Sequence, residues 1–413
     1  MYEWNETHRS IAEAMGRFVE MEIKPNLEAL EHGDLPPYEI LRKMFATFGI
    51  RDMAEMQYQS HLKRARARER GAETKNEPRE GAPGSDPGMD FALRMIPAIE
   101  ISRYSPGMVT ALGVSVGLTA NAVTSRGTAR QIERWAKDLL TLEKIGAWAN
   151  TEPGSGSDAF GSMMSTARRD GNGGYVLQGS KTFITNGPYA DTIVFICKLD
   201  EGNPPADRKV VSFVLDKGMP GLEASKPLRK MGLHSSPTGQ LFLQDVHVEA
   251  DRLLGETEEA PARSSAKETF TSERTGVAAM ALGIVEQCLT LCTEYAKTRV
   301  QFGRPIGDFQ LIQLKLAKME VARMNIQNLI FRQIELAGAG RTMNLAEASA
   351  CKLYAAQATM DVCLEAVQLF GGNGYMAEYH VEQLCRDAKV LQIYGGTDEI
   401  QVSQIARSLL QRS

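Results

Sequence analysis

Two short stretches of this 413-residue chain stand out: Trp148-Ala149-Asn150-Thr151-Glu152-Pro153-Gly154-Ser155-Gly156-Ser157-Asp158 and Lys181-Thr182-Phe183-Ile184-Thr185-Asn186-Gly187. The first is a glycine-rich turn with hydroxyls and free backbone N–H groups, which lets the backbone approach and hydrogen-bond an anionic group. The second reads as a strand end about one β-hairpin further on. Its Phe183, together with Trp148, is suited to lie against a flat conjugated ring. A glycine/serine turn alone is more often only a turn, so the two stretches together carry the argument.

Further segments of the same kind follow toward the C-terminus. They are Arg299-Val300-Gln301-Phe302-Gly303-Arg304-Pro305-Ile306 with Phe309-Gln310, then Gln368-Leu369-Phe370-Gly371-Gly372-Asn373-Gly374-Tyr375, Arg386-Asp387-Ala388-Lys389 and Ile393-Tyr394-Gly395-Gly396-Thr397-Asp398-Glu399-Ile400. In this order, the segments resemble the TEPGAGSD, K-x-W-I-T-N-G, R-x-x-F-G, Q-x-x-G-G-x-G, R-D-[AS]-[KR] and I-Y-[EG]-G-T signatures of the acyl-CoA dehydrogenase family. The resemblance covers everything except the stretch near residues 55–90.

Composition excludes several other classes of protein. The net charge of −4 indicates no general attraction to nucleic acid or to an anionic membrane. The N-terminus has no basic region followed by an apolar one, so we expect no secretory signal. We find no apolar run of ~18 residues, so we also expect no membrane-spanning helix. None of the six cysteines forms a C-x-x-C pair, and the six histidines match no metal-ligand spacing. We therefore expect buried free thiols and no metal site.

The hydrophobic pattern predicts an α+β protein in three domains. Three- and four-residue steps such as Ile11, Met15 and Phe18 predict an N-terminal helical domain over residues 1–145. β-branched and aromatic runs at 175–177, 192–196, 210–215 and 241–248 predict a middle β domain over residues 146–255. Long helical patterns at 269–299, 309–337 and 345–370 then predict a C-terminal helical domain over residues 256–413. The resemblance implies a β-barrel or sandwich in the middle and a four-helix bundle at the end.

One segment departs from the family. A basic run, residues 63–70, leads into a stretch from Gly71 to Pro87 that is rich in Gly, Pro, Glu and Lys. With nothing apolar to bury, this stretch is predicted to be disordered or a solvated hairpin. The basic run fits a solvated helix end better than a docking site for an acidic partner or for the phosphates of a ligand.

The resemblance implies that the chain binds FAD and acts on an acyl-CoA thioester. Residues carried across as FAD contacts within one subunit are Trp148, Asn150, Thr151, Gly156, Ser157, Phe183 and Thr185, with Thr397 and Glu399 near the pyrophosphate or adenosine end. Residues expected to reach the FAD of a neighbouring subunit are Arg299, Gln301, Phe302, Ile306, Phe309, Gln310, Gln368 and Gly372. Candidate substrate contacts are Ser157, Thr271, Arg274 and Tyr375. Phe183 stands where the family usually has tryptophan, and Trp148 and Asn150 also differ from the commoner residues.

The catalytic base is the main departure. Family members remove the α-proton of the thioester with a carboxylate while hydrogen bonds stabilise the developing enolate. Many carry that base in I-Y-E-G-T, where this chain has Gly395. The relocated-base members, long-chain and isovaleryl-CoA dehydrogenases, place it in an E-R pair at the first long C-terminal helix, which matches Glu273-Arg274. We therefore predict Glu273 as the base, with the Gly395 backbone N–H facing the thioester oxygen. Taken alone, Glu273 would read as a helix-end glutamate favoured by the helix dipole.

The resemblance implies a trans-2-enoyl-CoA product, electron transfer flavoprotein as acceptor, a role in fatty acid β-oxidation, and a homotetramer built as a dimer of dimers. Two alternatives stay open: a flavin-dependent oxidase or N-oxygenase on the same fold, and an inert acyl-CoA-binding homologue that has lost its base. We expect a cytoplasmic protein if the source is bacterial, and the mitochondrial matrix if it is eukaryotic and processed. Nothing in the sequence sets the acyl chain length.

Overall fold

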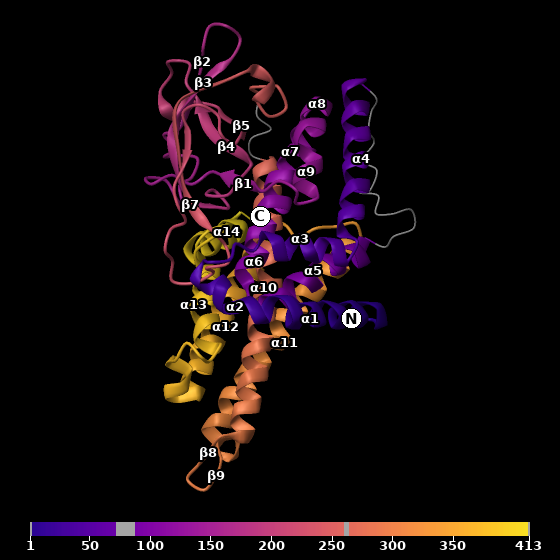
Figure 1. Cartoon of the computed structure of the whole chain (residues 1–413), viewed down its shortest axis with the longest axis vertical. Coiled ribbons are helices and arrows are strands. Elements are labelled where there is room, and N and C mark those ends of the chain that lie inside the picture. Colours follow the sequence, from indigo (N-terminus) through magenta and orange to yellow (C-terminus); the bar gives the residue numbers. More distant parts are fainter. Residues whose placement is uncertain (1, 72–86, 260–263, 412–413) are drawn as a thin grey trace.

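The computed structural model describes residues 2–71, 87–259 and 264–411. The side chains of residues 87, 88, 90 and 264–272 are not described. Figure 1 shows a β-rich part above a body of helices, with a long helical hairpin extending below. The α+β prediction, with helices before and after a β domain, is confirmed. The stretch predicted to be disordered lies almost wholly outside the described residues.

Helices of very different lengths form the N-terminal part. They are α1 (Glu6–Phe18), η1 (Val19–Ile23), η2 (Lys24–Asn26), α2 (Leu27–His32), α3 (Tyr38–Thr47), α4 (Ile50–Glu69), α5 (Pro87–Ser102), α6 (Pro106–Leu112), η3 (Gly113–Ala120), α7 (Asn121–Arg126), α8 (Ala129–Gln131), η4 (Ile132–Ala136) and α9 (Lys137–Leu140). Local capping explains where two of them begin. Asn5 and His8 form a reciprocal cap at α1, and Thr128 and Gln131 form another at α8.

The middle part is a seven-stranded mixed sheet. Its strands are β1 (Gly146–Ala149), β2 (Thr166–Arg169), β3 (Tyr175–Thr185), β4 (Thr192–Leu199), β5 (Val210–Asp216), β6 (Leu222–Ala224) and β7 (Thr238–Val248), and η5 (Pro205–Asp207) precedes β5. The order is β1-β4-β2-β3-β7-β6, with β5 pairing with β4. β1 and β2 run parallel to β4, and the other pairs are antiparallel. Every residue of β4 is buried, which explains its continuous apolar run.

The C-terminal part is a bundle of long helices. After η6 (Ala250–Arg252) come α10 (Ser264–Thr298), β8 (Val300–Gln301), β9 (Arg304–Pro305), η7 (Ile306–Asp308), α11 (Gln310–Gly338), α12 (Leu345–Phe370), η8 (Gly371–Tyr375), α13 (Val381–Lys389), η9 (Val390–Gln392) and α14 (Asp398–Leu410). α10 packs against α11 and α12, and α14 packs against α12. The β8–β9 hairpin joins α10 to α11 at the far end of the bundle (Figure 1).

The N-terminal helix α5 completes this bundle. It packs against both α10 and α11, and its Ala92 and Ile99 belong to the same buried apolar cluster as the bundle helices. The approach is close enough to require glycine, because a Cβ at Gly283 would lie 2.1 Å from the Ile99 carbonyl oxygen. The first and third parts of the chain therefore share one core.

From the sequence we expect no apolar run long enough to span a membrane. By length and composition alone, however, two helical stretches are long and apolar enough to do so: Pro106–Arg126 and Glu273–Thr298. Of the apolar window in the second, 72% is buried inside the fold. A core helix of a globular protein passes the same test, and α10 is such a helix, since it sits between α5, α11 and α12.

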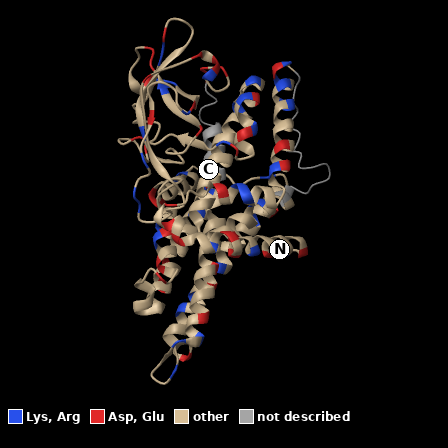
Figure 2. Cartoon of the chain, viewed as in Figure 1, with Lys and Arg blue, Asp and Glu red and all other residues tan. Residues whose placement is uncertain are grey.

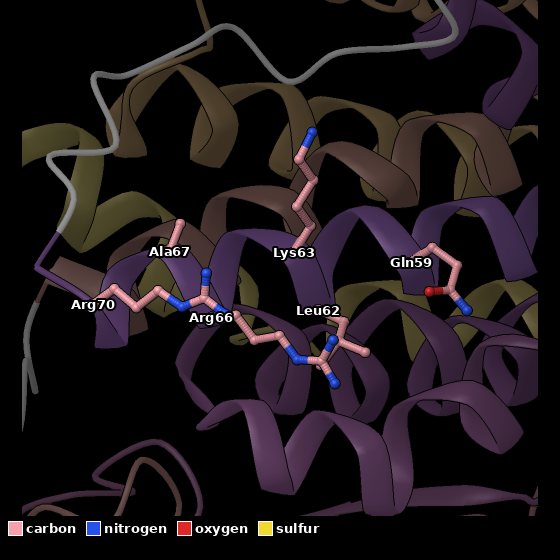
Figure 3. Close-up of a pocket in the computed structure, with 6 residues that line it drawn as sticks. All are labelled: Gln59, Leu62, Lys63, Arg66, Ala67 and Arg70. Atoms are coloured by element: carbon pink, nitrogen blue, oxygen red, sulfur yellow. The ribbon is translucent and has the colours of Figure 1, made fainter.

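The basic run forms the C-terminal end of α4, which stands beside α7–α9 (Figures 1 and 2). Some of the charged side chains in this run form ion pairs and hydrogen bonds within the chain. Arg66 pairs with Glu133, Arg68 donates to the Ser125 carbonyl at 3.0 Å, and Glu69 accepts from the Ala129 N–H at 2.7 Å. Figure 3 shows a hollow along this helix, lined by Gln59, Leu62, Lys63, Arg66, Ala67 and Arg70. None of these six residues belongs to the predicted site.

Candidate active site

The two motif-bearing stretches quoted first meet in the β domain. The Thr182 N–H donates to the Thr151 carbonyl at 2.9 Å. Lys181 Nζ donates to the Asn150 carbonyl at 2.9 Å and to Glu152 Oε1 at 2.8 Å. Glu152 also accepts from the backbone N–H groups of residues 164 and 165. A fully buried ion pair thus ties the glycine-rich turn to β3.

Phe183 is presented outward by a break in the strand. β3 and β7 lose register between Lys181 and Ile184, and Phe183 has a φ of 57° there. Its side chain is 69% exposed although its neighbours in the strand are buried. A large aromatic held in this strained conformation and left uncovered indicates a ligand surface.

Asn186 anchors the end of this stretch. Its side chain accepts from the Tyr38 hydroxyl at 3.0 Å and donates to the carbonyls of Ala111 and Gly146. The residue has no exposed surface and a φ of 64°, which asparagine tolerates better than most residues. One side-chain amide therefore joins α3, α6 and β1 to the end of β3.

The residues around this turn fit FAD. Asn150 Oδ1 is buried and has no hydrogen-bond partner among the described residues. Cβ atoms at Gly154 and Gly156 would meet nothing within 4 Å, so the turn borders open space. Thr185 is half-buried just beyond Phe183, and Ser157 is exposed on the turn. An open glycine turn, an unpaired acceptor and an uncovered ring suit a flat aromatic group with polar edges.

Glu273 and Gly395 lie side by side. Glu273 lies within α10, beyond the first turn of a helix that begins at Ser264, and Gly395 belongs to the turn before α14, where its φ is 60°. A Cβ at position 395 would lie 3.5 Å from Glu273 Cδ and 3.6 Å from Glu273 Oε1. The Glu273 carboxyl group therefore occupies the space that a side chain at 395 would enter.

Burial raises the pKa of Glu273, and the positive charges of Arg274 and Lys352 act against that rise. Arg274 is 4% exposed and donates to the Gly395 carbonyl oxygen at 3.4 Å and to Ser349 Oγ at 3.0 Å. Thr397 caps α14 by accepting from the Ile400 N–H, and Glu399 is exposed in its first turn. Of the predicted substrate contacts, Thr271 has its side chain outside the described residues.

A second group of predicted residues lies at the opposite end of the bundle (Figure 1). Phe302 is 93% exposed with a φ of 51°, and Tyr375 is 81% exposed. Tyr295 stacks on Phe370 at 4.1 Å, which places the ends of α10 and α12 together. The group contains Arg299, Gln301, Phe302, Ile306, Phe309, Gln310, Gln368, Gly372 and Tyr375; Ile306 is buried, Phe309 is half-buried and the rest are exposed.

Within one chain these residues do not reach the Glu273 site. Glu273 and Tyr295 are both on α10, and a helix rises ~1.5 Å per residue, so they are roughly 30 Å apart. Tyr375 belongs with this distal group, so it does not share the Glu273 site in the same chain. The expected role of the other residues toward a neighbouring subunit stays a prediction.

Sequence reasoning missed three buried polar residues that shape the site. Lys352 and Gln401 have no exposed surface and contact the turn at 395–396, and Asn186 was quoted but given no role. A lysine inside the otherwise apolar pattern of residues 348–356 was the available signal, because such a charge requires a partner.

This combination of fold and site defines a flavin-dependent oxidoreductase. Comparison with known proteins narrows the class. Residues 147–246 match the family model for the acyl-CoA dehydrogenase middle domain, and residues 263–410 match that for the acyl-CoA dehydrogenase C-terminal domain. A short-chain specific acyl-CoA dehydrogenase from Megasphaera elsdenii is 38% identical over 330 residues, which cover 80% of this chain and 84% of that protein.

Solved structures agree. The butyryl-CoA dehydrogenase of Megasphaera elsdenii superposes with a TM-score of 0.83 at 32% identity, covering 100% of both chains. An acyl-CoA dehydrogenase from Bacillus anthracis complexed with FAD gives a TM-score of 0.81 at 27% identity, covering 99% of this chain and 68% of that one. The chain belongs to the acyl-CoA dehydrogenase family. It is an FAD-dependent enzyme of that family.

Proposed function

We propose that this enzyme converts an acyl-CoA thioester to the trans-2-enoyl-CoA and that Glu273 is the base that removes the α-proton. One observation carries the proposal: the Glu273 carboxyl lies 3.5–3.6 Å from where the Cβ of a residue at position 395 would be. A base is defined by where its carboxylate lies, so a glutamate from α10 can take the place of one from the turn before α14.

The surroundings of Glu273 suit a base. Burial raises its pKa, so the carboxylate binds a proton more readily than an exposed glutamate does. The charges of Arg274 and Lys352 act against this rise in pKa, and so they favour the ionised form that a base requires. Gly395 complements this arrangement because it leaves the space in front of the carboxylate open. In this proposal the Gly395 backbone N–H donates to the thioester oxygen as negative charge develops there.

FAD, when bound, supplies the acceptor for the β-hydride. Trp148, Asn150, Thr151, Gly156, Ser157, Phe183 and Thr185 would hold it within one subunit, and the distal group of the bundle would reach the FAD of a neighbour. We infer a homotetramer from this division, because half of the predicted contacts lie at the far end of the bundle. Electron transfer flavoprotein is the proposed electron acceptor. The similarity to short-chain and butyryl-CoA dehydrogenases makes a short straight-chain thioester the first substrate to test.

The proposal is tested by replacing Glu273 with Gln, which keeps shape and hydrogen-bonding capacity but removes the proton acceptor. Anaerobic stopped-flow absorbance at the flavin band, with saturating butyryl-CoA, should show reduction slowed by about 10²–10⁴, the usual contribution of a positioned base. FAD content and acyl-CoA binding should stay unchanged. Glu294→Gln, an exposed glutamate further along α10, is the matched control and should reduce flavin at the parent rate.

A second variant tests the shared position of the two carboxylates. Adding Gly395→Glu to Glu273→Gln should restore part of the rate, and only part, because the new side chain enters a position with a positive φ. Reduction at the parent rate in Glu273→Gln would overturn the assignment of the base. Fast aerobic turnover without an added acceptor would favour a flavin oxidase, and no bleaching by any thioester would favour an inert acyl-CoA-binding homologue.

A further inference from the structure

The turn that carries Gly395 has two consecutive glycines, which make it flexible, yet several hydrogen bonds hold it in the structure. Gly395 and Gly396 have φ values of 60° and 88°, a conformation that glycine adopts readily. Two consecutive glycines also have the greatest conformational freedom to lose on folding. A backbone N–H that must meet a thioester oxygen needs a fixed direction, so something other than local preference has to hold this turn.

Lys352 holds the turn from α12. Its Nζ donates to the Gly396 carbonyl oxygen at 2.9 Å and lies 3.4 Å from Asp398 Oδ1. The side chain has no exposed surface, and burial lowers its pKa. Burying an ammonium group is costly unless it is paired and hydrogen-bonded. Here a single lysine binds the turn and the first residue of α14 together.

Gln401 and Arg274 complete the arrangement from two other helices. Gln401 Nε2 donates to the carbonyls of both Gly395 and Gly396, at 3.1 and 2.7 Å. Arg274 Nε donates to the Gly395 carbonyl at 3.4 Å. By contrast, within the described part of the chain the N–H groups of Gly395 and Gly396 donate to no acceptor. The carbonyl side of the turn is therefore fully engaged, and the N–H side is left free.

We propose that Lys352, together with Gln401, is a positioning residue that fixes the Gly395–Gly396 turn so that the Gly395 N–H is aimed at the thioester oxygen of the substrate. The inference rests on the proposed function and deepens it. The lysine and glutamine do not touch the substrate. They act through the peptide groups that they hold, and they replace the rigidity that a turn with two glycines lacks.

Lys352 has a second effect, on Glu273. The charged and titratable groups that face Glu273 are Arg274 from α10, Lys352 from α12 and Tyr394 from the segment before the turn, and Asp398 of α14 faces Lys352. Removing Lys352 takes away one of the two cations that oppose the raised pKa of Glu273. The rate of flavin reduction, which needs the ionised carboxylate, should then reach its plateau at higher pH.

The test compares Lys352→Met with Lys315→Met, which removes a lysine paired with Glu365 on the same bundle. Loss of a whole oxyanion donor lowers kcat by roughly 10²–10³, and a donor that is merely misdirected should lower it by about 10-fold or more. We expect this loss in Lys352→Met, with unchanged FAD content and a pH profile shifted upward. Lys315→Met should keep the parent kcat and profile.

A measurement without turnover reports on the turn directly. In the Glu273→Gln background, the ¹³C chemical shift of bound [1-¹³C]butyryl-CoA measures how strongly the thioester carbonyl is hydrogen-bonded. Adding Lys352→Met should move this shift back toward the value for free thioester, and adding Lys315→Met should leave it in place. Gln401→Met gives an independent variant that is easier to fold, because Gln401 Oε1 has no partner among the described residues. It should move the shift in the same direction.

The outcomes separate the two claims. If Glu273→Gln is slow but Lys352→Met and Gln401→Met both keep the parent kcat and carbonyl shift, the positioning role is wrong and the base stands. If Glu273→Gln reduces flavin at the parent rate, the base itself is wrong. A lower kcat with an unchanged carbonyl shift would also overturn the positioning role.

Discussion

Lys181 and Glu152 form an ion pair with almost no access to solvent, at 0% and 5% side-chain exposure. Burial lowers the pKa of Lys181, and Glu152 opposes that change. Such a pair adds little net stability over an apolar pair, but breaking it by removing one partner leaves an uncompensated charge. In this protein the pair also fixes the turn from Asn150 to Glu152 against β3, so its loss should affect cofactor binding as well as stability.

We predict that Glu152→Gln lowers the free energy of unfolding by about 3 kcal/mol, the lower end for breaking a buried pair. FAD occupancy of the purified protein, read from the ratio of flavin to protein absorbance, should fall in parallel. Glu201→Gln removes one acid from an exposed pair with Arg169 and serves as the control, with no measurable change in either quantity. Full flavin occupancy in Glu152→Gln would separate the ion pair from cofactor binding.

The β8–β9 hairpin is the element on which the subunit arrangement depends. Arg299 and Gln301 are exposed there, and Phe302 has almost its whole side chain in solvent. This exposed aromatic residue lies at the tip of a hairpin, far from the glycine-rich turn that is proposed to bind FAD in the same chain. Such exposure indicates that another surface covers it. The proposed partner is the FAD site of a neighbouring subunit.

We expect Arg299→Glu to weaken FAD binding by at least about 10-fold, or about 1.4 kcal/mol. Light scattering on the same sample should show a smaller assembly, because the charge reversal affects cofactor and subunit contact together. Arg341→Glu, an exposed arginine in the loop after α11, is the matched control. A monomeric protein that retains its full complement of FAD would contradict the subunit-crossing role.

Sequence patterns predicted these elements with uneven success, for physical reasons. The helix expected at 345–370 is α12 from Leu345 to Phe370, because its apolar period is long and Asn344 caps its start. The strand expected at 175–177 is the first part of β3, which continues to Thr185. The stretch from Lys181 was read separately as a strand end, and the structure joins the two segments into one strand whose register with β7 shifts near Phe183.

Side-chain pairs across the fold were beyond sequence reasoning. The apolar pattern around Lys352 signals that this lysine needs a partner, but only the folded chain shows that the partners are Glu152 for Lys181 and the Gly396 carbonyl for Lys352. The Glu273–Gly395 relation was predicted by resemblance, and the structure adds their separation. Burial of a charge depends on residues distant in the chain, which local periodicity does not report.

At the scale of the whole molecule, the three parts meet around Asp387 of α13. Asp387 accepts from the Leu233 N–H of the β domain and from Gln383, while Glu31 of α2 pairs with Arg386 and with His234. Burial raises the pKa of Asp387 to about 7, and the charge of Glu31 adds to the rise. The protonated form is therefore the one that the fold favours.

This raised pKa predicts how stability depends on pH. The stabilisation from protonated Asp387 is complete below its unfolded pKa near 4 and is lost as pH rises through about 7, with a slope of at most about 1.4 kcal/mol per pH unit. Asp387→Asn cannot ionise, so its unfolding free energy, measured in urea, should depend less on pH between 4 and 7. Asp34→Asn, at an exposed loop, should keep the parent slope. An unchanged slope in Asp387→Asn would assign the pH dependence to other groups.

Because α5 packs against α10 and α11, it cannot complete its packing until both helices have been translated. α1 and α6 contact α5 and are made before it or directly after it, but α10, which covers the side of α5 that carries Ala92 and Ile99, begins about 160 residues later. At 5–20 residues per second this interval is roughly 8–30 s. Throughout that time the side of α5 that α10 and α11 will cover stays exposed, and Gly283 must be in place before α10 can pack there. Chaperone demand during translation should therefore concentrate on α5, and a circular permutant that starts at the β domain and places α5 after α14 should shorten the exposure.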